Sequence, residues 1–186
     1  MSRLEELIKY SKLLHLNNLV IGSGGNISVK EAGKDVVQIK KKGVNMSCAD
    51  EDSFLEVGLS PEAIARNKEI MSSEYPMHIA VYKTREEVKA IIHTHSPYAI
   101  AVANRIDVLE KVSYELEYLL ITPVPVIEYI EPGSQELAEI VAEAIKKGAN
   151  AVLLKKHGVL SVGSTLQEAF LRALAVERAA ITFLHS

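Results

Sequence analysis

The segment that most constrains this chain is an apolar run over residues 88–97 that ends in His-x-His. Its β-branched residues predict a buried strand, with His93 and His95 at the end of it. Side chains at positions i and i+2 of a strand point to the same face. The two imidazoles are therefore placed as two ligands of a metal ion, or as two surface histidines at a strand end.

Two other segments favour the metal interpretation. A second apolar strand ends in Lys155-Lys156-His157-Gly158, and Ser72-Ser73-Glu74 places an acid in a turn upstream. Three histidines without a cysteine cluster suit a catalytic zinc site, which keeps one coordination position open. Such an ion polarises a carbonyl and its neighbouring hydroxyl, and the carboxylate of Glu74 could move the proton.

A glycine-rich segment predicts an anion site. In Gly22-Ser23-Gly24-Gly25-Asn26, the glycines let the backbone approach a bound group and expose its N–H donors, and Ser23 and Asn26 add side-chain donors. Ser72 and Ser73 open a helix, whose N-terminus favours anions. The pattern is neither a dinucleotide nor a Walker motif. The simpler alternatives are a tight turn between strands and a Ser73 that only caps the helix.

Composition excludes several classes of protein. The length of 186 residues suggests one domain over 1–186. A net charge of −3 with scattered lysines argues against nucleic-acid binding, and no apolar run is long enough to span a bilayer. The single cysteine excludes an internal disulfide and fits a reducing, cytoplasmic setting, and the charged amphipathic N-terminus does not predict a signal peptide.

The hydrophobic periodicity predicts an α/β domain with a mostly antiparallel sheet and helices outside it. Residues 60–71 could form a short helix or an ordered loop, residues 106–120 are ambiguous, and the prolines in 123–127 predict an edge strand. Helices are expected at 2–17, 72–83, 97–104, 134–148 and 165–184, and strands at 27–29, 36–39, 54–59, 88–95, 151–154 and 159–162.

Taken together, these motifs resemble the zinc-dependent class II aldolase family of the L-fuculose-1-phosphate aldolase type, which also includes the adducin head. The likeness covers nearly the whole chain and implies a three-layer αβα fold. It rests, in this order, on the segment Gly22-Ser23-Gly24-Gly25-Asn26-Ile27-Ser28, on Ser72-Ser73-Glu74, on His93-Thr94-His95 and on His157-Gly158.

The resemblance implies a role for each matching residue. His93, His95 and His157 would hold one Zn²⁺ per subunit, and Glu74 would be the catalytic acid/base and a further zinc ligand when substrate is absent. Tyr114 lies where such aldolases carry a tyrosine that is donated across a subunit interface to protonate the leaving aldehyde, in a homotetramer with sites between neighbours. The residues expected around the phosphate are Ser23, Gly24, Asn26, Gly43, Ser72 and Ser73.

The implied reaction is reversible aldol cleavage of a ketose 1-phosphate, such as L-fuculose 1-phosphate, to dihydroxyacetone phosphate and a short aldehyde such as lactaldehyde. Glu74 favours an aldolase over a sugar-phosphate 4-epimerase, where an aspartate is expected. A methylthioribulose-1-phosphate dehydratase and a decarboxylase of a phosphorylated keto acid are alternatives within the family. An assembly domain like the adducin head is the non-enzyme alternative.

One segment departs from the family pattern. The usual Thr-Pro-(Ser/Thr)-Gly phosphate loop is replaced by Lys40-Lys41-Lys42-Gly43. Lys42 occupies a threonine position, so we expect a point charge to hold part of the phosphate. A lysine run at this place is also typical of a solvated strand edge that discourages strand pairing.

Overall fold

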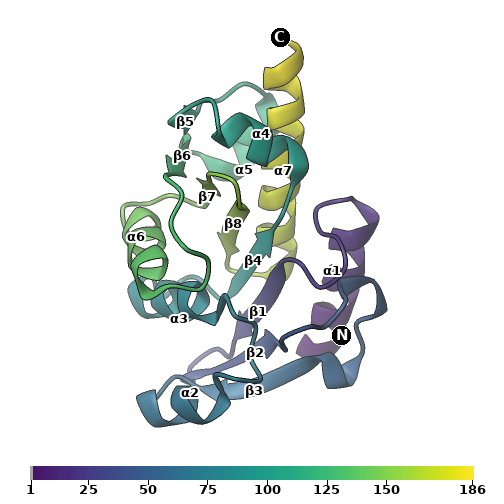
Figure 1. Cartoon of the computed structure of the whole chain (residues 1–186), viewed down its shortest axis with the longest axis vertical. Coiled ribbons are helices and arrows are strands. Elements are labelled where there is room, and N and C mark those ends of the chain that lie inside the picture. Colours follow the sequence, from purple (N-terminus) through teal and green to yellow (C-terminus); the bar gives the residue numbers. More distant parts are fainter. Residues whose placement is uncertain (1) are drawn as a thin grey trace.

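The computed structural model describes residues 2–186, whose strands form one eight-stranded sheet in the order β3-β2-β1-β4-β8-β7-β6-β5 (Figure 1). The strands are β1 (Asn26–Lys30), β2 (Val36–Lys40), β3 (Phe54–Gly58), β4 (Ala90–Thr94), β5 (Val108–Leu109), β6 (Val124–Ile127), β7 (Ala151–Leu154) and β8 (Gly158–Gly163). The α-helices are α1 (Arg3–Leu16), α2 (Pro61–Asn67), α3 (Tyr75–Thr84), α4 (Pro97–Ala103), α5 (Tyr114–Leu120), α6 (Gln135–Lys146) and α7 (Leu166–His185).

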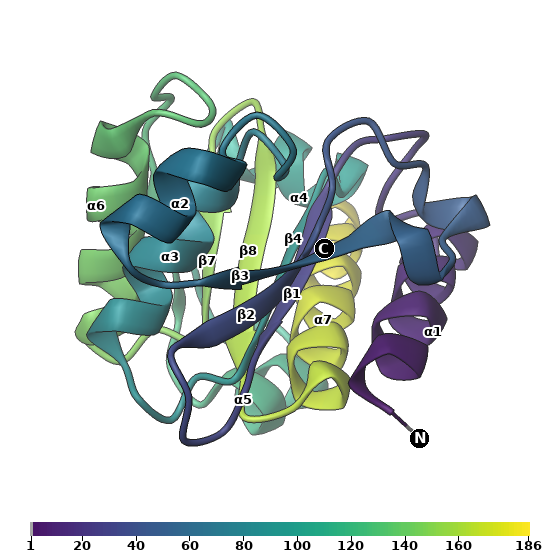
Figure 2. The same cartoon turned by 90° about the horizontal axis from the view of Figure 1, so that it is seen from below.

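The sheet is mostly antiparallel, as the sequence predicts. In the part of the chain that the structure describes, β6 and β7 pair in parallel and the other neighbouring strands pair antiparallel. Helices α2, α3 and α6 cover one face, and α1, α4, α5 and α7 cover the other (Figures 1 and 2). The predicted three-layer α/β architecture is therefore confirmed.

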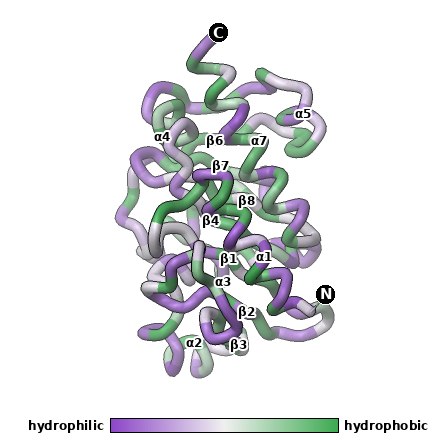
Figure 3. Tube along the Cα trace, turned by 90° about the vertical axis from the view of Figure 1, so that its right-hand side faces the viewer, coloured by the Kyte–Doolittle hydropathy of each residue, from purple (hydrophilic) through white to green (hydrophobic). Residues whose placement is uncertain are grey.

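The core lies between the sheet and these two layers of helices. On α6, Leu137, Val141 and Ile145 follow the i, i+4, i+8 spacing and are buried against the sheet and α3. The long α7 is apolar on most sides and packs against β4, β8 and three helices of its own layer. Hydrophobic segments run through the middle of the molecule along β8 and α7 (Figure 3). No helix among the described residues is long and apolar enough to cross a membrane.

Three local predictions need refinement. The helix expected from 72 begins only at Tyr75, because Glu74 is its N-cap residue, and it is therefore not capped by Ser73. The segment 60–71 contains the short helix α2, which begins after Ser60; the Ser60 side chain accepts from the Ala63 N–H. The ambiguous segment 106–120 divides into the two-residue strand β5 and the helix α5.

The prediction that 123–127 forms an edge strand is wrong, because β5 lies outside β6 and occupies the edge. Pro125 is tolerated on this inner strand for a geometric reason. It faces Val108, but the hydrogen bond between the two strands runs from the Val126 N–H to the Asp107 carbonyl at 3.0 Å. The ladder with β7 starts only at Val126. The proline therefore removes no donor that the sheet uses.

Candidate metal centre and active site

The strand register gathers the predicted site residues at one end of the sheet. Asn26, the first residue of β1, pairs with His93 near the end of β4, and Thr94 pairs with Val159 near the start of β8. His157 lies in the tight turn between β7 and β8. Histidines that are more than 60 positions apart in sequence therefore meet because the antiparallel strands β4 and β8 are neighbours.

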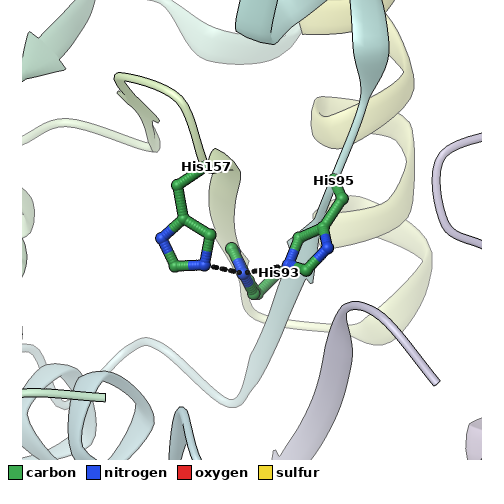
Figure 4. A group of neighbouring side chains, drawn as sticks. All are labelled: His93, His95 and His157. Carbon is green, nitrogen blue, oxygen red and sulfur yellow. Dashed lines mark hydrogen bonds between the residues drawn. The ribbon is translucent and has the colours of Figure 1, made fainter. Parts of the chain in front are cut away.

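The three imidazoles converge through their Nε2 atoms (Figure 4). The Nε2 of His93 lies 3.2 Å from that of His157 and 3.1 Å from that of His95. Two ligands at a tetrahedral zinc ion with Zn–N bonds of about 2.0–2.1 Å would be separated by about 3.3 Å. These two distances fit a shared metal ion, and the ligand atoms of all three histidines lie within 4.8 Å of one another.

Hydrogen bonding and burial also prepare the histidines for a metal. The Nδ1–H of His93 donates to the Val159 carbonyl at 3.0 Å, which leaves the lone pair on Nε2, facing the other two rings. Burial lowers the pKa of His93 well below its ordinary value, lowers the pKa of His157 to about 4 and lowers that of His95. All three rings are therefore neutral at pH 7, the form that binds a metal.

Two glycine segments pack closely around this centre, so side chains are excluded there. A Cβ on Gly158 would lie 1.8 Å from the Thr94 carbonyl oxygen. In the glycine-rich loop, a Cβ on Gly24 would lie 2.9 Å from Nδ1 of His95, and one on Gly25 would lie 2.7 Å from the His93 carbonyl. The predicted anion loop is therefore in direct contact with the segment that carries His93 and His95.

Glu74 is a buried acid at the start of α3, with a side chain that is not fully paired. Its Oε2 is buried and has no hydrogen-bond partner among the described residues. Burial raises the pKa of Glu74, while a hydrogen bond from the Gly133 backbone opposes the increase. Glu177, the other buried glutamate, accepts from the N–H groups of Tyr98 and Ala99 at the start of α4. The burial of Glu177 is therefore explained by its hydrogen bonds to α4, whereas one carboxylate oxygen of Glu74 has no hydrogen-bond partner among the described residues.

Gly133 lies in the turn before α6 and packs against Ser73 and Glu74. It has a φ of 76°, in the left-handed region that favours glycine. A Cβ here would lie 2.8 Å from the Ser73 carbonyl and 3.8 Å from Oε1 of Glu74. Gly133 was not predicted as a site residue, because nothing in its local sequence indicates a contact with residues 73–74.

The other predicted residues occupy the loops at the same end of the sheet. The N–H of Ser72 donates to the Lys40 carbonyl at 3.0 Å, which joins the turn before α3 to the end of β2. Ser72 and Asn26 are buried. The predicted phosphate ligands that face solvent, at least in part, are Ser23, Gly24, Gly43 and Ser73, and Lys42 is exposed as well.

Tyr114 is the predicted residue that the structure keeps away from the histidines. It is the first residue of α5 and is 76% exposed, with its ring stacked on Tyr118 at a centroid distance of 6.0 Å. Helix α5 lies at the opposite end of the sheet from the glycine-rich loop (Figure 2). Tyr114 could therefore reach such a site only in another copy of the chain.

A buried chain of hydrogen bonds behind Asn26 was not predicted. The Tyr82 hydroxyl lies 2.8 Å from Ser28 Oγ, which lies 2.6 Å from Nδ1 of His78, and His78 Nε2 bonds to Oδ1 of Asn26. If Nε2 of His78 donates to Asn26 Oδ1, then Nδ1 accepts from the Ser28 hydroxyl, which in turn accepts from the Tyr82 hydroxyl. The amide nitrogen of Asn26 is then turned away from His78. The i, i+4 spacing of His78 and Tyr82 on an otherwise apolar helix face was the available signal.

The buried histidines predict that the metal-free protein loses stability in acid. Burial lowers the pKa of His78 to about 3 and that of His93 well below its ordinary value. Below about pH 6.5 the unfolded chain takes up protons that the folded chain does not, so stability falls as the pH falls. At about 1.4 kcal/mol per pH unit for each fully titrating group, His78 and His93 together cost about 3 kcal/mol between pH 6.5 and 5, and the lowered pKa values of His95 and His157 act in the same direction.

Urea unfolding of chelator-treated protein at pH 7 and pH 5 measures this loss. His78→Gln removes one of these groups, so the variant should show a shallower dependence of unfolding free energy on pH. The matched substitution His15→Gln, at an exposed position on α1, should leave the dependence unchanged. A His78→Gln slope parallel to that of the parent protein would contradict the assignment.

Comparison with known proteins identifies the family. The sequence matches the family described as Class II Aldolase and Adducin N-terminal domain over residues 5–184. The L-fuculose phosphate aldolase of Methanococcus vannielii is 33% identical over 177 residues, which are 95% of this chain and 93% of that protein. The 5-deoxy-D-ribulose 1-phosphate aldolase of Bacillus thuringiensis serovar kurstaki is 31% identical over 173 residues, 93% of this chain and 80% of that protein.

A solved structure agrees with these sequences. The structure of an L-fuculose 1-phosphate aldolase has a TM-score of 0.86 to this chain at 32% identity, and the match covers 100% of this chain and 87% of that one. The fold and the three-histidine site thus define a lyase from a metal-dependent group of enzymes. The chain belongs to the class II aldolase and adducin N-terminal domain family, and within it to the fuculose-phosphate aldolase type.

Proposed function

We propose that this protein reversibly cleaves a ketose 1-phosphate to dihydroxyacetone phosphate and a short aldehyde, with L-fuculose 1-phosphate and lactaldehyde as the leading pair. The observation that carries the proposal is the meeting of three Nε2 atoms with the glycine-rich loop, whose Gly24 approaches His95. Relatives that act on fuculose phosphate and on 5-deoxyribulose 1-phosphate support a phosphorylated ketose and leave the aldehyde to be found.

Metal binding and proton transfer are assigned to different residues of this chain. A zinc ion, when bound, acts as a Lewis acid on the substrate carbonyl and its neighbouring hydroxyl. The ligands for it are His93, His95 and His157, whose neutral rings are spaced for a single ion. Glu74 moves the proton at the carbon that becomes the hydroxymethyl group of dihydroxyacetone phosphate, because its raised pKa suits a group that both takes and returns a proton.

The phosphate is placed at the loops that adjoin these groups. We infer that backbone N–H donors of the glycine-rich loop and side-chain donors of Asn26 surround it, with Lys42 on the turn that follows β2. The buried chain from Tyr82 to Asn26 keeps the Asn26 amide in one orientation. The remaining proposed phosphate ligands are Ser23, Gly24, Gly43, Ser72 and Ser73.

The residues of the site favour an aldolase over a 4-epimerase and over an assembly domain. The acid is Glu74, whereas a sugar-phosphate 4-epimerase is expected to carry an aspartate there. A methylthioribulose-1-phosphate dehydratase shares the three histidines and the glutamate, so only the reaction itself separates it from the aldolase. The reaction likewise tests a keto-acid phosphate decarboxylase. An adducin-like assembly role has no use for three neutral imidazoles that converge on one point.

Tyr114 leads us to propose that the working enzyme is a homotetramer with shared sites. The ring is exposed at the end of the sheet opposite the glycine-rich loop, with Tyr118 stacked on it. In a neighbouring copy this ring would protonate the leaving aldehyde. The molecular mass in solution tests the assembly, and a monomer that is fully active would remove Tyr114 from this role.

Hydrogen exchange on the product tests the proposed reaction directly. Zinc-loaded protein is incubated with dihydroxyacetone phosphate in D₂O, and NMR follows the loss of one hydrogen from the hydroxymethyl carbon. We expect exchange that a chelator abolishes and added Zn²⁺ restores, because proton removal at this carbon needs both the ion and Glu74. Absence of exchange in zinc-loaded protein would contradict the aldolase and favour the dehydratase or the decarboxylase.

A further inference from the structure

Lys40 is the one lysine with a side chain that is almost completely enclosed in the described part of the chain, at 1% exposure. It ends β2, where the residues before it alternate regularly, with Val37 and Ile39 buried against the core. Continued alternation would turn Lys40 toward solvent. Instead the ammonium is folded inward beneath the loops that follow β2 and precede β1.

Three loops of the proposed phosphate pocket are joined at this residue. The Nζ of Lys40 donates to the carbonyls of Ser23, at 2.8 Å, and Val44, at 2.9 Å. The Lys40 carbonyl accepts from the Ser72 N–H at 3.0 Å. The glycine-rich loop, the turn after β2 and the turn before α3 therefore share one lysine, and each of these loops carries residues of the proposed phosphate site.

The charge of Lys40 is not compensated by the protein. An ammonium has three N–H donors, and the two carbonyls use two of them. The lysine makes no ion pair among residues 2–186. Burial lowers the pKa of Lys40 to about 8, so the charged form predominates at pH 7. A buried cation without a counter-ion is costly, and a bound anion would remove that cost.

We propose that Lys40, rather than the exposed Lys42, provides the fixed positive charge that binds the phosphate monoester of the substrate. The proposal rests on the proposed function, since it assigns the anion of that same site. Lys42 is on the surface of the turn and its charge is screened by water, whereas the Lys40 ammonium is enclosed by the loops and keeps one donor free. The usual phosphate loop of the family offers hydroxyl donors, and Lys40 would supply a point charge in their place.

Direct binding of the anion tests this assignment separately from turnover. Calorimetric titration of zinc-loaded protein with inorganic phosphate and with dihydroxyacetone phosphate compares the parent chain with Lys40→Met. We expect both affinities to fall about 10- to 100-fold, the loss typical of one charged hydrogen bond. The matched substitution Lys41→Met, on the neighbouring half-buried lysine, should leave both affinities unchanged.

Unphosphorylated dihydroxyacetone distinguishes a phosphate-binding charge from a clamp that only holds the loops. In Lys40→Met, exchange of dihydroxyacetone in D₂O should keep its parent rate, while the KM for the phosphorylated compound rises more than kcat falls. An equal loss with both compounds would overturn the proposal and leave Lys40 as a clamp. Unchanged phosphate affinity, or a loss in Lys42→Ala but not in Lys40→Met, would also overturn it.

Two further measurements keep the proposal testable if Lys40→Met does not fold. Lys40→Arg keeps the charge and should retain most of the phosphate affinity. In the parent protein labelled with ¹⁵N-lysine, phosphate should shift the Nζ signal of Lys40 more than that of any other lysine, and an unmoved signal would contradict the proposal. If the parent protein neither binds dihydroxyacetone phosphate nor exchanges its hydrogen, the proposed function itself fails.

Discussion

His95→Ala should abolish metal binding and slow product exchange by about 10³-fold or more, because the loss of a Lewis acid removes several kcal/mol of charge stabilisation. His95 is the best of the three ligands for this test. It is only half-buried, whereas His93 is fully enclosed and bonds to the Val159 carbonyl. Its removal therefore takes one Nε2 from the site and leaves the strand and its core contacts in place.

Metal content and thermal unfolding are measured on the same preparations. Since a bound ion stabilises the folded state by mass action, the variant is compared with chelator-treated parent protein, and the two should unfold at similar temperatures. His15→Ala, an exposed histidine on α1, is the matched control and should retain the metal and the activity. Full exchange by metal-free His95→Ala would exclude these histidines from the reaction.

Glu74→Gln should keep the metal and slow hydrogen exchange on dihydroxyacetone phosphate by about 10²- to 10⁴-fold, the usual contribution of a general acid/base. The amide has the size of the carboxyl group but does not take up the proton. Burial already disfavours the charged carboxylate of Glu74, so the neutral amide should not lower the stability of the fold.

The measurement follows exchange by NMR in zinc-loaded protein, together with the affinity for inorganic phosphate. Phosphate affinity should be unchanged, because Glu74 is proposed to act on the reacting carbon and not on the anion. Glu62→Gln, on the exposed side of α2, is the matched control and should exchange at the parent rate. Undiminished exchange in Glu74→Gln would leave the catalytic acid/base to another residue.

The local patterns of the sequence determine most of the secondary structure and pick out the three histidines that are proposed to bind the metal. His-x-His at the end of an apolar strand predicts two rings on one face, and the glycine-rich segment predicts a loop of close approach. Both signals are short in range and depend on spacing alone. The one wrong element assignment was the edge strand at 123–127. A proline in a strand indicates a missing N–H donor, but it does not indicate whether another strand pairs on the far side.

The sequence alone determined that His93 and His95 share a face, that His157 follows a second strand and that Glu74 lies at the start of a helix. The tertiary structure decided which segments meet: it paired β4 with β8, brought Gly133 against Ser73, and enclosed Lys40 rather than Lys42 beneath the loops. The physical reason is that burial and hydrogen-bond partners depend on contacts between residues far apart in the chain. Periodicity describes only what neighbours along one strand or helix have in common.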